Sequence, residues 1–160
     1  GLLLKQIAAE PSFRLCRWAS LSLDQKDLPT AAAYLEQAQS LAGSPALKGS
    51  IAHQWGRLAL ARGNAGEALA QFSRALEADR RVLDRAAMAA DLFSLGETHQ
   101  VRGEFPQAWD CYGRAFDLYA SLGKKPQMER CLKQLKEVNL QGGLGQSLER
   151  FEKHPRLKPS

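Results

Sequence analysis

A spacing of small and large side chains recurs three times along the chain and limits the fold more than any other feature. The clearest copy runs from Trp55-Gly56 to Ala68, Phe72 and Ala75. The same offsets give Leu95-Gly96, Ala108, Tyr112 and Ala115 further along, and Trp18-Ala19, Ala31, Leu35 and Ala38 before it. Residues three and four apart share one face of a helix, so each copy predicts two helices that pack on each other.

The small residues have a physical role in this pattern, because they let two antiparallel helix backbones approach closely. They are Ala19, Gly56 and Gly96 on the first helices and Ala31, Ala68 and Ala108 on the second. We expect Trp18, Trp55, Leu35, Phe72 and Tyr112 to fill the space beside them. Gly63 and Gly103 are expected to end the first helices in a left-handed conformation. Lys26 stands at that place in the first copy, so a differently built turn is predicted there.

These ordered matches resemble the tetratricopeptide repeat, whose pattern is W-x2-L-G-x2-Y followed by A-x3-F. The resemblance implies an all-α fold, a right-handed superhelical solenoid of antiparallel helix pairs. We place the repeats at about 12–43, 49–82 and 86–122 and a capping helix at 126–139, which together make a repeat domain over 1–139. The last helix has Lys136 where a small residue is wanted, which is typical of a terminal unit with a polar outer face.

The repeat period differs from the family's usual length of about 34 residues. From Ala31 to Ala68 it is 37 residues, and from Ala68 to Ala108 it is 40. This resembles a long variety of the repeat, of roughly 40 residues, in scaffold proteins of signalling and motor complexes. There a charged turn opens the next helix, as we expect of Asp84-Arg85 here.

The two ends of the chain lie outside the repeats. The run Leu2-Leu3-Leu4, followed by Ile7, predicts either a short helix packed on the first repeat or a tail. Packing is favoured, because the exposure of three leucines to water would be unfavourable. The segment 140–160 reads as a linker and basic tail. A short helix at 146–153 is predicted to fold back there before Pro155.

Composition fits a domain with a hydrophobic core. The chain has 160 residues, of which 44% are hydrophobic. No apolar run reaches the length of about 18 residues that spans a bilayer, which argues against a membrane protein. Cys16, Cys111 and Cys131 are an odd number without metal-site spacing, so we interpret them as buried fillers rather than disulfides. A reducing, cytoplasmic location is therefore predicted, and a periplasmic one stays open.

The sequence lacks the groupings that catalysis or metal binding requires. Only His53, His99 and His154 could act as histidine bases or ligands, and no H-E-x-x-H or G-x-S-x-G pattern is present. Gly142-Gly143-x-Gly145 has no preceding strand and no following Lys-Ser or Lys-Thr, which excludes a phosphate-binding loop. We therefore predict a non-enzymatic protein without cofactor or metal.

The net charge of +5 raises the question of nucleic acid. Basic residues are scattered among acidic ones, whereas phosphate binding requires a patch of one sign. This scatter argues against a nucleic-acid partner. The best place for such a patch is the C-terminal end, with Arg150, Lys153, Arg156 and Lys158.

The resemblance implies that the first helices of successive repeats line a concave groove. The residues predicted to bind a partner there are Phe13, Arg17, His53, Gln54, Arg57, Phe93, Glu97, Gln100, Arg130, Lys133 and Gln134. Four of them are cations, with two phenylalanines between them, a surface suited to an extended acidic or carboxylate-ended peptide. The alternative, that these side chains simply face water, stays open.

A chaperone-tail adaptor does not fit this groove, because the family's carboxylate clamp requires lysine and asparagine at fixed positions. Those positions hold Cys16, Ser20, Gln54, Ala90 and Ser94. The leading hypothesis is therefore a scaffold or adaptor that binds a protein or peptide segment other than a chaperone tail. The alternatives are a self-assembly or structural module, which forms a homo-oligomer, and a regulatory domain of a larger protein.

Overall fold

The structure, a computed structural model, describes residue 2 and residues 10–41 and 43–159. The predicted packing of the N-terminal leucine run depends on residues 3–7, which lie outside this set. Within the described residues, every regular element is a helix. They form two compact units, residues 1–83 and 84–160.

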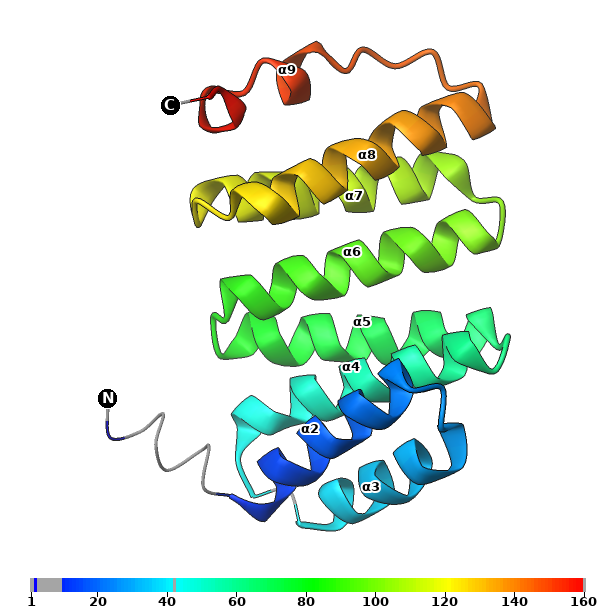
Figure 1. The fold of residues 1–160 in the computed structure, drawn as a ribbon, viewed down its shortest axis with the longest axis vertical. Helices are drawn as coiled ribbons and strands as arrows, with labels where there is room; N and C mark the ends of the chain where they lie inside the picture. Colours follow the sequence, from blue (N-terminus) through cyan, green and yellow to red (C-terminus); the bar gives the residue numbers. More distant parts are fainter. Residues whose placement is uncertain (1, 3–9, 42, 160) are drawn as a thin grey trace. The chain divides into compact units, whose positions relative to one another are not determined.

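Each unit consists of antiparallel helix pairs (Figure 1). The helices of the first unit are α2 (Pro11–Asp24), α3 (Leu28–Leu41), α4 (Pro45–Ala61) and α5 (Ala65–Arg81). Those of the second unit are α6 (Arg85–Val101), α7 (Phe105–Ser121), α8 (Lys125–Gly142), α9 (Glu149–Glu152) and the 3-10 helix η1 (Pro155–Leu157). The pairs α2–α3, α4–α5 and α6–α7 correspond to the three sequence copies, and the predicted all-α class is confirmed.

The small residues lie where the helices of a pair approach most closely. A Cβ atom added to Gly56 would lie 2.6 Å from the ring of Phe72, and one added to Gly96 would lie 2.7 Å from Tyr112. Since carbon atoms in contact need about 3.5–4.0 Å, only glycine fits at both places. The large rings of α5 and α7 therefore pack directly on the backbones of α4 and α6.

Trp18 does not fill the helix interface, contrary to the sequence prediction. Its side chain is 49% exposed, and its ring lies 5.6 Å from that of Tyr34. Trp55, at the same place in the next copy, is half-buried and donates its indole N–H to Gln39 at 3.2 Å. Trp55 lies on α4, which packs on both α2 and α3, and it contacts the core clusters around Leu15 and Leu35, whereas Trp18 belongs to neither of these two clusters.

The turns after the first helices have the left-handed residue that glycine favours, with φ of 77° at Gly63 and 74° at Gly103. The prediction of a different turn at Lys26 is wrong, because Lys26 takes a φ of 61°. The closing bond is also the same: Asp27 N–H donates to the Ser22 carbonyl at 2.8 Å, as Asn64 N–H does to Ala59 at 2.9 Å. The backbone bond thus sets this turn even where the side chain disfavours it.

Side chains cap the N-termini of α5 and α6. Asp84 accepts a bond from Ala87 N–H at 3.0 Å and so opens α6, as the sequence predicts. Asn64 caps α5 in the same way through Glu67 N–H. From α4 onward, successive helices begin at residues 45, 65, 85, 105 and 125.

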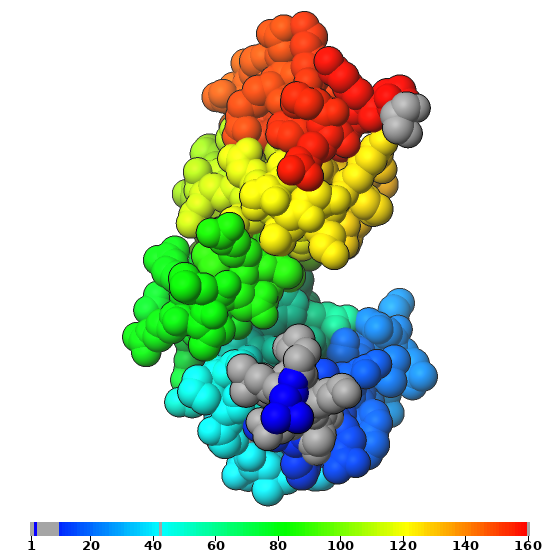
Figure 2. All heavy atoms as spheres, turned by 90° about the vertical axis from the view of Figure 1, so that its left-hand side faces the viewer, coloured from blue at the N-terminus to red at the C-terminus, as the bar shows by residue number. Residues whose placement is uncertain are grey.

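The C-terminal segment folds back on α7 and α8. Phe151 is only 2% exposed, and its ring packs edge-on against Phe116 at 5.0 Å and Trp109 at 5.7 Å. Lys136 of α8 forms an ion pair with Glu152, with 3.4 Å between Lys136 Nζ and Glu152 Oε1. In Figure 2 this red segment lies on the yellow atoms where α7 ends and α8 begins. The chain after Gly143 therefore covers part of α7 and α8.

Candidate partner-binding faces of the two units

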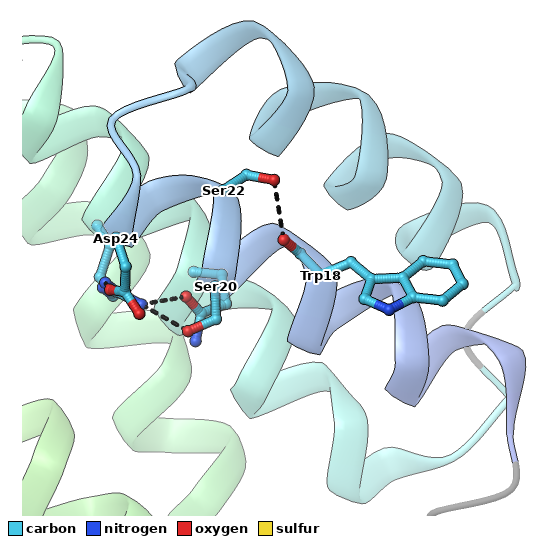
Figure 3. A network of polar contacts seen from close by, with 6 residues as sticks. Trp18, Ser20, Ser22 and Asp24 are labelled. Carbon is cyan, nitrogen blue, oxygen red and sulfur yellow. Dashed lines mark hydrogen bonds and ion pairs between the residues drawn. The ribbon is translucent and has the colours of Figure 1, made fainter.

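A polar network joins α2 and α4 on the first-helix face of the first unit (Figure 3). The Arg57 guanidinium donates to Asp24 at 2.6 Å, to Ser20 at 2.8 Å and to Gln54 at 2.9 Å. Asp24 and Ser20 both belong to α2, so one side chain of α4 bonds two residues of its neighbour. The positive charge of Arg57 is matched by a carboxylate within its own unit.

The pairing changes the role of Arg57. Its side chain is 31% exposed and that of Asp24 is 62% exposed, so the ion pair is partly screened by water. The three bonds fix the guanidinium against α2 and leave it little freedom to turn toward a ligand. Arg57 therefore acts as a contact between helices as well as a surface cation.

The other predicted residues of the first unit differ in exposure. Phe13 is half-buried against a core cluster that includes Leu15 and Ile51. The His53 ring lies 5.2 Å from the ring of buried Phe72 on α5. Arg17 is exposed, and among the described residues no carboxylate pairs with it.

The second unit brings Phe93 and Arg130 together. The guanidinium carbon of Arg130 lies 4.7 Å from the centre of the Phe93 ring, a cation–π contact between α6 and α8. The Phe93 ring also meets Tyr112 edge-on at 5.2 Å and is only 7% exposed. Phe93 therefore supports the exposed Arg130 and offers little surface of its own.

Amide and hydroxyl groups continue this face of the second unit. Tyr112 donates its hydroxyl to Gln100 at 2.8 Å, and Gln100 donates to Gln141 at 2.8 Å. Burial raises the pKa of Tyr112 above its usual value, so the hydroxyl stays a donor across the physiological range. Glu97 and Gln134 are half-buried, and Lys133 is exposed.

The structure thus joins two pairs of predicted site residues directly, Gln54 with Arg57 and Phe93 with Arg130. The prediction omitted Ser20 and Asp24 as partners of Arg57. A signal for Ser20 existed, because Ser20 and Arg57 are 37 residues apart, as are Trp18 and Trp55. Equivalent residues of successive first helices lie side by side in a repeat fold, so the contact follows from the repeat alignment.

The cysteines show no sign of reactivity. All three are buried, and burial raises the pKa of Cys16 and Cys111 to about 11 and that of Cys131 to about 12. A thiol with such a pKa is almost fully protonated at neutral pH, whereas the thiolate is the nucleophile.

Two kinds of feature are absent from the part of the chain that the structure describes. There, no cluster of three or more His, Cys, Asp or Glu side chains is arranged to hold a metal ion. In the same residues, no helix combines the length and the apolar character needed to cross a bilayer.

Comparison with known proteins agrees with the helix pairs. Residues 47–121 match the tetratricopeptide repeat family. A solved structure from Podosopora anserina, described as a putative kinesin light chain with nearly identical TPR-like repeats, is similar with a TM-score of 0.58 at 16% identity. That match covers 93% of this chain and 82% of the other.

A second crystal structure, of a point variant of the same Podosopora anserina protein, has a TM-score of 0.56 at 15% identity. It covers 90% of this chain and 78% of that one. No curated protein matches the sequence. At these identities the likeness shows the fold alone.

The fold and the recurring small-residue contacts define a helical-repeat protein. The family match makes the assignment specific for part of the chain: residues 47–121 are similar to the repeats of tetratricopeptide repeat proteins. Such proteins generally serve as protein–protein interaction scaffolds without catalytic activity.

Proposed function

We propose that this chain is a non-enzymatic scaffold whose first-helix faces bind an acidic segment of a partner protein. The observation that carries the proposal is on α8. Arg130 stands on the Phe93 ring, and Lys133 follows three residues later on the same helix face. Both are exposed, and within the described residues neither has a carboxylate partner.

Two such cations suit a carboxylate ligand. The contact with Phe93 restricts the Arg130 side chain, so less conformational entropy is lost when a ligand binds. Charge-assisted bonds to arginine and lysine are roughly twice as strong as neutral ones. Arg17, which pairs with no carboxylate of the described residues, adds a third cation on the equivalent face of the first unit.

Arg57 is a poor choice for testing this proposal. Its replacement by glutamate would place a second carboxylate beside Asp24 and break the bonds that join α2 to α4. Lost partner binding could then result from altered helix packing. A clean test therefore changes Arg130 and Lys133, whose side chains make no hydrogen bond or ion pair within the described part of the chain.

The test is affinity capture from the source cell extract with quantitative identification of the captured proteins. We expect the Arg130→Glu/Lys133→Glu double variant to lose at least tenfold of the specific partner signal, because two attractive contacts become repulsive. Lys124→Glu is the matched control, since Lys124 is exposed, unpaired within the described residues and directly before α8. Equal capture by the double variant and the wild type would refute the proposal, provided circular dichroism shows both folded.

A further inference from the structure

A hollow on another face of the first unit has its own recognition chemistry. It lies between α3, α4 and α5 and is lined by Gln39, Lys48, Ile51, Trp55, Gln71 and Arg74, among others. We call it the outer hollow. Trp55 and Arg57 are two residues apart, about 200° around a helix of 3.6 residues per turn. The outer hollow therefore lies on the opposite side of α4 from the network of Arg57.

Two amide side chains of the outer hollow are held in fixed orientations. The Trp55 indole N–H can only donate, so the Gln39 oxygen must face it, at 3.2 Å. The carboxylate of Glu67 can only accept, so the Gln71 NH2 group must face it, at 2.8 Å. These bonds leave the Gln39 NH2 group as a donor and the Gln71 oxygen as an acceptor.

A donor and an acceptor from neighbouring walls match what a peptide group needs. A backbone carbonyl takes one donor and a backbone N–H takes one acceptor. In the described residues, no further partner occupies the Gln39 NH2 group or the Gln71 oxygen. An extended chain lying along α4 would place its peptide groups between α3 and α5.

The side chains that line the outer hollow carry two positive charges, on Lys48 and Arg74, against the one carboxylate of Glu67, and this balance indicates which side chains such a peptide carries. Lys48 and Arg74 are both exposed, and no described carboxylate pairs with either of them. The carboxylate of the nearby Glu77 forms an ion pair with Arg81, with 3.1 Å between Glu77 Oε1 and Arg81 Nε. Trp55 and Ile51 supply an apolar floor beside the two cations.

We propose that the outer hollow is a second docking site, which binds an extended acidic segment of a partner protein. A carboxylate of the segment pairs with Lys48 and Arg74, an apolar side chain lies on Trp55 and Ile51, and the backbone bonds Gln39 and Gln71. The site uses residues other than those of the first-helix faces, so a partner bound here leaves those faces free.

The experiment uses nuclear magnetic resonance of the full chain with a defined probe. The probe is a capped eight-residue peptide that repeats serine, aspartate, serine, leucine, so that aspartate and leucine share one face of an extended chain. The indole N–H groups of Trp18, Trp55 and Trp109 give three resonances, and Ile7 and Ile51 give two δ-methyl resonances. We expect the peptide to shift the Trp55 and Ile51 signals and to leave those of Trp18 and Trp109 in place.

Charge variants then identify the cations. Lys48→Gln and Arg74→Gln should each weaken the binding of the probe about fivefold, as the loss of one charge-assisted contact does. Arg62→Gln is the matched control, because Arg62 is an exposed cation of the same unit outside the hollow. A peptide with asparagine for aspartate should bind at least tenfold more weakly.

Three outcomes would overturn the proposal. The Trp55 and Ile51 signals could stay unmoved at millimolar peptide, or the asparagine peptide could bind equally well. The same signals could also shift with protein concentration alone, which would make a second copy of the chain the occupant. The Arg130→Glu/Lys133→Glu variant should bind the probe at the outer hollow as the wild type does, so failure here is distinct from failure at the first-helix faces.

Discussion

Single residues control how closely the helices of a pair approach. Gly56 and Gly96 are each the one residue type that fits beneath an aromatic ring of the paired helix. Ala19 and Ala31 in the first pair are fully buried, and Leu35, smaller than the rings of Phe72 and Tyr112, completes that pair. The size of the first small residue and that of the facing side chain thus vary together.

The Gly56→Ala substitution tests this contact. The added methyl group would lie 2.6 Å from the Phe72 ring, so the helices must separate or the ring must leave its position. We expect the free energy of unfolding to fall by about 2 kcal/mol, as in other overpacked cores. Urea unfolding followed by circular dichroism measures it.

Gly43→Ala is the control, because a Cβ atom at Gly43 would meet no atom within 4 Å. An equal loss of stability in both variants would show that loss of glycine, and not the contact with Phe72, is responsible.

At the scale of the helix, the turns after the helices keep the same backbone conformation even where the residue type differs. Lys26 and Leu83 take the left-handed conformation that Gly63, Gly103, Gly123 and Gly143 take elsewhere. An L side chain in this conformation costs roughly 1–2 kcal/mol. The packing of the flanking helices must supply that free energy at Lys26 and Leu83.

Lys26→Gly should therefore stabilise the first unit. The substitution removes the strain, although glycine also loses more backbone entropy on folding. We expect a net gain of about 0.5–1 kcal/mol in the free energy of unfolding, measured by urea unfolding. Gly63→Ala makes the opposite change at the equivalent turn and should destabilise the chain, and a stabilising effect there would contradict the explanation.

At the scale of the whole molecule, the fold is two compact units of paired helices, and the second is completed by its C-terminal segment. Phe151 packs on Phe116 and Trp109, and the Arg150 guanidinium lies 2.9 Å from Asp117. Burial of a phenylalanine between two aromatic rings makes this segment part of the core of the unit.

Phe151→Ala should lower the stability of the second unit by about 3 kcal/mol, because it removes a fully buried ring and leaves a cavity. Trp109 fluorescence in a Trp18→Phe/Trp55→Phe background reports the unfolding of this unit, since Trp109 contacts Phe151. Lys153→Ala is the control, as Lys153 is exposed and, among the residues that the structure describes, pairs only with Glu149. Equal midpoints for Phe151→Ala and the control would show that the segment is not part of the core.

The sequence by itself determined the helix pairs and most of their turns. Small and large residues at fixed offsets specify which helix faces meet, and a capping residue such as Asp84 acts on a neighbour three residues away. Both signals are local, so one copy of the pattern suffices to read them. The same local pattern predicts which face of each first helix points away from its paired helix.

Only the tertiary structure decided which charged groups on those faces are free. Arg57 bonds Asp24, which is 33 residues away, whereas Arg130 rests on Phe93 and has no carboxylate partner among the described residues. The exposure of Trp18 depends on which helices lie beside α2, and the outer hollow forms from three helices together. Such properties depend on neighbours brought together by folding, and the helical period does not encode them.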